Sequence, residues 1–167
     1  MSDDIATLQK ALWDINFDDF QATLATNVTA VYFTTIAFLS LLHAGNKKLL
    51  ASSGYSSQII VTSSVAGYST QVQSSLAYSV SKAAVTHLAR NLATYFVNLQ
   101  IRVNVIVPGL YPSELTGSQS DEMGHVEMKG WDTKYTDIPA HRPGLEREIA
   151  GLGIFLARYN LFVMMLT

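Results

Sequence analysis

The chain has 167 residues, of which 49% are hydrophobic and 14% charged, with a formal net charge of −2 and no cysteine. This is the composition of one folded domain over residues 1–167, and the scattered Lys and Arg residues form no basic stripe for nucleic acid. The absence of cysteine excludes a disulfide framework and a thiolate metal site. The acidic N-terminus lacks the pattern of a targeting segment, so we expect a cytoplasmic protein.

The first part of the chain is predicted to be helical. Residues 1–16 read as a polar arm or short helix, and a longer helix begins near Asp18. Residues 27–42 are apolar nearly all round this helix, which indicates burial on more than one side. The run is too short and too rich in threonine for a good membrane span, and we expect no membrane partner.

Two short runs are typical of buried strands. The first, QIIVT at residues 58–62, is β-branched and follows a predicted loop over residues 43–57. The second, at residues 101–107, alternates and ends at Pro108 and Gly109, which cannot continue a central strand. One face of the second run carries three valines: Val103, Val105 and Val107.

A helix is predicted between the two strands and another after them. Ser74 or Ser75 can cap the first of these helices, and residues 146–157 form the second. Apolar residues recur at every fourth position of the first helix and predict its core stripe: Val80, Ala84, Leu88, Leu92 and Phe96. Helices that alternate with strands predict an α/β layer with parallel strands.

A tyrosine and a lysine stand four residues apart in the helix between the strands. Tyr78 and Lys82 project from the same helix face at this spacing. An ammonium about 4–6 Å from a phenol favours its ionised form, so such a tyrosine can exchange a proton near neutral pH. The spacing alone is weak, because a Tyr–Lys contact is also common on a solvated helix face.

The surroundings of this pair resemble the classical short-chain dehydrogenase/reductase family, and the likeness is greatest to fungal-type members. It extends from about residue 27 to residue 157, and the residues that carry it follow one another in the family's order: Asn27, Ser63-Ser64, Tyr78, Lys82 and Pro108-Gly109. The resemblance implies that Ser64 bonds the substrate oxygen, Tyr78 is the acid/base and Lys82 lowers its pKa. Asn27 would hold a proton-relay water.

The resemblance also implies a cofactor side and a substrate side of the site. Pro108 and Gly109 would lie near a nicotinamide, if one binds. Residues 113–139 would cover the substrate, and the apolar contacts expected there are Tyr111, Met123, Met128 and Trp131. An uncommitted surface loop is the alternative for this stretch.

The sequence departs from the family pattern at its start. None of the ten glycines lies in a GxxxGxG or GxGxxG pattern, which in the family cradles the cofactor pyrophosphate. We therefore expect a truncated Rossmann-like layer, in which a small parallel sheet of two or three strands is flanked by helices. The most favoured cofactor state is none, with NAD(P) as the alternative.

Three functions remain open for a small-molecule substrate. The first is a cofactor-independent isomerase, epimerase, dehydratase or cyclase, acting on a carbonyl- or phenol-bearing molecule in fungal secondary metabolism. The second is an NAD(P)-dependent carbonyl reductase, and the third is a catalytically inactive scaffold. We expect no metal site, and we expect a homodimer or larger oligomer because the apolar helix at residues 27–42 cannot bury all its faces against two strands.

Overall fold

The computed structural model describes most of the chain: residues 4–70, 75–114, 116 and 140–158. Within this part, β1 (Gln58–Thr62) and β2 (Arg102–Ile106) pair in parallel along their whole length. Both strands lie where the sequence predicts them. The architecture is the truncated Rossmann-like α/β layer that the sequence predicts, with a sheet of two strands in the described residues.

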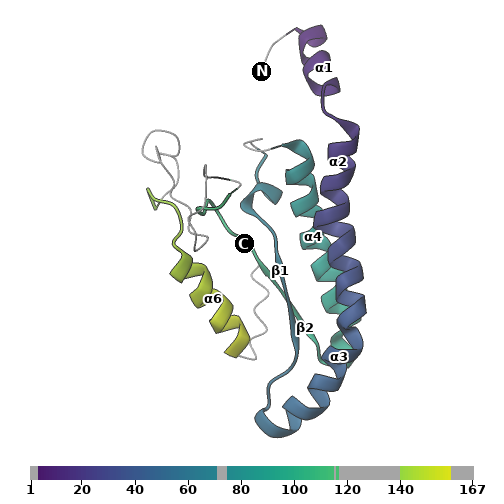
Figure 1. Cartoon of the computed structure of the whole chain (residues 1–167), viewed down its shortest axis with the longest axis vertical. Helices are drawn as coiled ribbons and strands as arrows, with labels where there is room; N and C mark the ends of the chain where they lie inside the picture. The colour runs from purple at the N-terminus through teal and green to yellow at the C-terminus, as the bar shows by residue number, and fades with distance from the viewer. Residues whose placement is uncertain (1–3, 71–74, 115, 117–139, 159–167) are drawn as a thin grey trace.

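Helices cover both sides of these strands (Figure 1). α3 (Ala30–Ser53) and α4 (Leu76–Tyr95) lie on one side, and α6 (Glu146–Arg158) lies on the other. Both strands run toward the end of the molecule at which α4 begins. The carboxyl ends of the strands therefore lie near the first turns of α4, where ligands bind in open α/β sheets.

The N-terminal region is helical, as the sequence predicts. α1 (Ile5–Trp13) is capped by Asp4, and α2 (Phe17–Leu24) is capped by the side chain of Asn16. α2 runs through a π-helical turn, η1 (Ala25–Thr29), directly into α3. A π-helical turn inserts one extra residue into the helix and often marks a functional position.

The loop predicted over residues 43–57 is wrong for residues 43–53, because α3 continues to Ser53, and only residues 54–57 form a loop. Long-range contacts stabilise this extension. The Asn46 side chain is buried, donates to the carbonyl oxygens of Leu99 and Gln100, and accepts from the amide of Ser57. The helix ends at Gly54, whose φ of 71° is the left-handed conformation that suits a glycine after a helix.

The core stripe predicted on α4 is partly wrong. Leu92 and Phe96 are buried, but Val80 is 42% exposed. A strict spacing of four drifts by about 40° at each step on a helix with 3.6 residues per turn, so its first and last members face different directions. The buried positions of α4 are centred on a neighbouring face, which shares only Leu92 with the predicted stripe: Ala77, Ser81, Val85, Thr86, Ala89 and Leu92.

The two faces of the sheet are covered differently. Val103 and Val105 pack on the cluster of Val61, Val85 and Ala89 under α4, which confirms their common face. The opposite face carries polar side chains beside Ile60 and Ile106. There Asn104 donates to the Gln58 side chain at 3.0 Å, and that side chain donates to the carbonyl of Leu156 in α6 at 2.8 Å.

α3 exposes a large apolar surface in the single chain. Phe33 is 64% exposed and Leu41 65%, and Phe38 is exposed between them. By length and composition alone, the continuous helix over Phe17–Ser53 could cross a membrane, contrary to the expectation that the run is too short. One helix of this kind says little about a membrane, since core helices and signal sequences meet the same criterion.

Candidate active site

The carboxyl ends of β1 and β2 place Ser64 beside the Pro108 turn. The amide of Ser63 donates to the carbonyl of Ile106 at 2.8 Å, and the amide of Val65 donates to that of Pro108 at 3.0 Å. These bonds extend the parallel ladder past the strands. Ser64 thus lies between two residues that bond the neighbouring strand, and its side chain caps a short 3₁₀ helix, η2 (Val65–Gly67), by accepting from the amide of Ala66 at 3.2 Å.

Gly67 brings this loop into direct contact with α4. A Cβ at this position would lie 2.7 Å from the amide nitrogen of Ala83 and 2.8 Å from the carbonyl carbon of Lys82. Such distances are too short for any side chain, so only glycine allows the loop and the helix to approach so closely. The contact places the Ser64 loop against the helical turn that carries Lys82.

α4 positions the tyrosine and the lysine. Ser75 caps the helix by accepting from the amide of Tyr78 at 3.2 Å, which confirms one of the two expected caps. The Nζ atom of Lys82 lies 5.5 Å from the centroid of the Tyr78 ring. It also donates to the carbonyl of Thr62, the last residue of β1, at 3.1 Å. The predicted pair is therefore close in space and tied to the carboxyl end of the sheet.

Burial changes the electrostatics of this lysine. Desolvation lowers the pKa of Lys82 from its usual value. The ammonium is partly shielded from water. At such a position a positive charge acts on nearby groups more strongly than it does in bulk solvent. The Lys82 ammonium therefore stabilises a neighbouring hydroxyl oxygen that gains negative charge.

Asn27 lies at the centre of the π-helical turn and contacts α4 one residue before the lysine. Its Nδ2 atom donates to the Oγ atom of Ser81 at 2.9 Å, and Ser81 Oγ donates to the carbonyl of Tyr78 at 2.7 Å. The side-chain amide of Asn27 therefore forms part of the contact between the π-helical turn and α4. The proton-relay water expected at this residue is a role that the described contacts do not test.

Tyr111, expected to contact substrate, packs against the start of the C-terminal helix. A Cβ on Gly144 would clash with the ring of Tyr111, so the ring covers the glycine closely. The amide of Gly144 donates to the carbonyl of Leu110 at 2.9 Å. The segment that follows Pro108 and Gly109 is thereby hydrogen-bonded to the residues that lead into α6.

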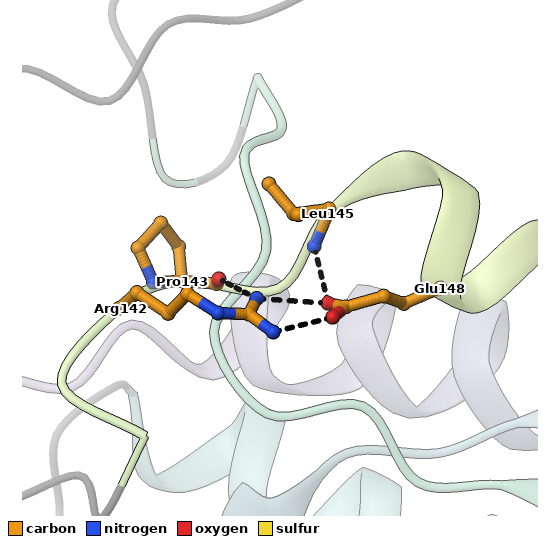
Figure 2. Close-up of polar contacts among 4 residues, drawn as sticks. All are labelled: Arg142, Pro143, Leu145 and Glu148. Atoms are coloured by element: carbon orange, nitrogen blue, oxygen red, sulfur yellow. Dashed lines mark hydrogen bonds and ion pairs between the residues drawn. The ribbon is translucent and has the colours of Figure 1, made fainter.

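An ion pair stabilises the turn that leads into α6 (Figure 2). The Arg142 guanidinium contacts both carboxylate oxygens of Glu148, and one of these oxygens accepts from the amide of Leu145 at 2.8 Å. The hydrogen bond from Arg142, followed by the one from Leu145, lowers the pKa of Glu148 to about 2. Arg142 also donates to the carbonyl of Pro143, so the turn before α6 is held at three points.

The structure brings together the residues expected to carry the chemistry and leaves part of the substrate side undescribed. Tyr78, Lys82 and the Ser64 loop lie at one end of the sheet, beside the Pro108 turn. Met123, Met128 and Trp131 lie outside the described residues, as does most of the segment 113–139. Ser81 and Gly67 were not predicted to belong to the site, although Gly67 is the single glycine between β1 and α4.

The donors at this edge fit the nicotinamide end of a dinucleotide. Lys82 offers an ammonium and Tyr78 a hydroxyl, and nothing lies within 4 Å of a Cβ placed on Gly109. The phosphates require closely spaced backbone amides, and no glycine-rich turn of that kind occurs in the 167 residues. In the described part of the chain, no three His, Asp or Glu side chains are grouped as metal ligands.

Comparisons with known proteins agree on one family. A family model described as enoyl-(acyl carrier protein) reductase matches residues 2–163. The short-chain dehydrogenase/reductase SAT3 of Stachybotrys chartarum is 38% identical over 165 residues, and PhomF of Diaporthe leptostromiformis is 37% identical over 153. Each alignment covers 92% of this chain, but only 60% and 51% of the relatives. The chain thus spans little more than half the length of these curated relatives.

A solved structure gives the same result in three dimensions. The RhlG/NADP active-site complex of Pseudomonas aeruginosa superposes with a TM-score of 0.72 at 32% sequence identity. The match covers 86% of this chain and 52% of that protein.

Proposed function

Because the chain belongs to the short-chain dehydrogenase/reductase family, we propose that it carries the proton-transfer site of an NAD(P)-dependent oxidoreductase. The substrate would be a carbonyl-bearing small molecule of fungal secondary metabolism. The observation that carries the proposal is the position of Lys82 Nζ, 5.5 Å from the ring centroid of Tyr78 at the carboxyl end of a parallel sheet.

The roles of the side chains follow from their chemistry. Tyr78 gives its phenolic proton to the carbonyl oxygen as that oxygen gains negative charge. The Lys82 ammonium stabilises the tyrosinate that is left behind. Ser64 Oγ accepts from the amide of Ala66, so its own hydrogen can be donated to the same substrate oxygen.

The cofactor would lie on the Pro108 side of the site. When bound, NAD(P)H supplies the hydride that the carbonyl carbon receives. Lys82, Tyr78 and the turn at Pro108 and Gly109 would hold its nicotinamide end. Support comes from the structural match to a protein solved with NADP. We assign no residue of this chain to the phosphates.

A cofactor-independent enzyme is the second candidate. The same three side chains suffice to move a proton at or beside a carbonyl, because Lys82 and Ser64 can stabilise an enolate oxygen while Tyr78 exchanges the proton. An isomerase, epimerase, dehydratase or cyclase requires no more. The observation that favours this candidate is that Tyr78, Lys82 and the Ser64 loop lie together at one end of the sheet.

The assembly is part of the proposal. α3 exposes Phe33, Phe38 and Leu41, and α4 exposes Val80 and Tyr95. Apolar surface of this extent favours association, so we propose a homodimer in which these helices meet their counterparts in a second copy. A cytoplasmic location remains our expectation.

One set of assays separates the candidates. The 167-residue chain is titrated with NADPH and NADH by calorimetry, and is then incubated with a panel of ketones in D₂O, with and without cofactor. Cofactor binding together with ketone-dependent NAD(P)H oxidation supports the oxidoreductase. Deuterium incorporation beside the carbonyl without cofactor supports the second candidate. A folded chain that does neither is a binding protein or scaffold.

A further inference from the structure

The most deeply buried polar side chain of α4 stands between the acid/base pair and the π-helical turn. Ser81 is 0% exposed, although it is adjacent in sequence to Lys82 and three residues after Tyr78. Its neighbours in the core stripe of the helix are apolar at Ala77 and Val85. A hydroxyl at such a position requires partners, because a buried polar group without hydrogen bonds is costly.

The partners of Ser81 come from two different helices. A hydroxyl has one hydrogen to donate and can accept others. Ser81 Oγ donates to the carbonyl of Tyr78 at 2.7 Å and accepts from Nδ2 of Asn27 at 2.9 Å. A single oxygen atom thus joins the main chain of Tyr78 to a side chain 54 positions away from Ser81 in the sequence.

The π-helical turn explains why Asn27 reaches this oxygen. η1 (Ala25–Thr29) widens the helix by one residue at the point where it passes α4. Asn27 is the central residue of this turn, and its side chain is partly buried. The irregular turn and the first turns of α4 are therefore fixed to each other by one polar contact.

We propose that Ser81 is a positioning residue of the acid/base site, which through its bonds to Asn27 and to the Tyr78 carbonyl sets the first turns of α4 in register with the π-helical turn. This role rests on the proposed function of Tyr78 and Lys82. The side chain of Ser81 is not required to touch the substrate. Its effect is on where the Tyr78 hydroxyl lies relative to a substrate held by the Ser64 loop.

The first test measures coupling without any substrate. Ring resonances of Tyr78 are recorded by NMR in the wild type, Asn27→Ala, Ser81→Ala and the double variant. We expect Asn27→Ala to move the Tyr78 resonances in the wild-type background, and to move them little when Ser81 is already alanine. Equal displacements in both backgrounds, or none in either, would overturn the positioning role.

The second test measures turnover. Ser81→Ala should lower kcat by about 10- to 100-fold while KM changes little, because a small displacement of a reacting group costs this much. The double variant should be no slower than the slower single variant. Thr35→Val is the matched control, since Thr35 is a buried hydroxyl of α3 outside the site. In this variant the Tyr78 ring resonances and kcat should match those of the wild type.

The two tests can fail separately. If no variant, including the wild type, turns over any substrate, the proposed function fails and the NMR coupling still decides the contact. If turnover is present and Ser81→Ala has the kcat of Thr35→Val, the positioning role is wrong while the proposed function stands.

Discussion

The ammonium of Lys82 lies over the ring of Tyr78, with Nζ 5.5 Å from the ring centroid and bonded to the carbonyl of Thr62. The last residue of β1 therefore fixes where the charge lies, and α4 fixes where the phenol lies. A charge held in this way can stabilise the negative charge that develops on the phenolic oxygen as the proton is transferred.

Removal of that charge should change the pH dependence of the reaction. The Lys82 charge stabilises the negative charge that forms on the phenolic oxygen of Tyr78 during proton transfer, so Lys82→Met should lower kcat/KM at neutral pH. Since desolvation lowers the pKa of Lys82, its charge is lost at lower pH than that of a free lysine, and the two profiles should converge at alkaline pH. The profile of kcat/KM checks this. Superimposable profiles would show that the lysine has no electrostatic role.

Gly67 should be sensitive to the smallest added side chain. In Gly67→Ala the new Cβ would meet the backbone of Lys82 and Ala83 at less than 3 Å, so η2 must move away from α4. We expect a lower unfolding temperature and a larger loss of kcat. Gly151→Ala in α6 is the control, because nothing lies within 4 Å of its Cβ and alanine favours a helix by about 1 kcal/mol. Equal stability of the two variants would contradict the close contact.

The Arg142–Glu148 pair should make stability depend on pH in the acid range. The carboxyl of Glu148 has a pKa of about 2 when folded and a reference value of 4.5, so it binds its proton more readily when unfolded. The pair stabilises the fold above about pH 4.5, and this contribution is lost as the pH falls through about 2. Glu148→Gln should flatten this part of the stability profile.

The effect of this pair should also depend on salt. Both side chains are solvent-exposed, so their interaction is screened. Chemical unfolding at pH 2–5, in low salt and in 1 M salt, measures both properties. If the Glu148→Gln variant and the wild type have the same pH profile of stability at low salt, the pair contributes nothing to stability.

The apolar face of α3 should control assembly. We expect the wild type to sediment as a dimer at micromolar concentration and Phe38→Glu to sediment as a monomer or to aggregate, because a buried charge opposes association. Lys47→Glu changes the charge at an exposed polar position of the same helix and should remain dimeric. A folded wild-type monomer at micromolar concentration would refute the proposed assembly.

The parts of the fold that depend on local sequence could be predicted, and the parts that depend on distant contacts could not. The run QIIVT and the Ser75 cap are local signals, and both lie where they were expected. The end of α3 was missed because its stability comes from Asn46, which bonds carbonyl groups more than fifty residues away. Gly45 falls within the stretch predicted as a loop, but in the structure it lies in α3 and allows close approach of the Ser57 side chain.

The candidate site also has features that local sequence predicts and features that depend on distant contacts. The spacing of Tyr78 and Lys82 follows from helix geometry and is visible in the sequence. The bridge from Asn27 through Ser81 needs a π-helical turn and a contact between two helices, for which the sequence carries no periodic signal. The contact of the Tyr111 ring with Gly144 spans more than thirty residues, so spacing in the sequence cannot reveal it, and the substrate contact expected of Tyr111 stays a prediction.

The turnover of Tyr78→Phe, measured beside the wild type with NADPH and a reactive ketone, tests the central claim most directly. The substitution removes only the hydroxyl, so the fold should be kept while kcat falls by about 10²–10⁴. Tyr95→Phe, at an exposed position near the end of the same helix, should keep the wild-type rate. A Tyr78→Phe variant that reduces the ketone at the wild-type rate would contradict the account, because the proton would then come from another group.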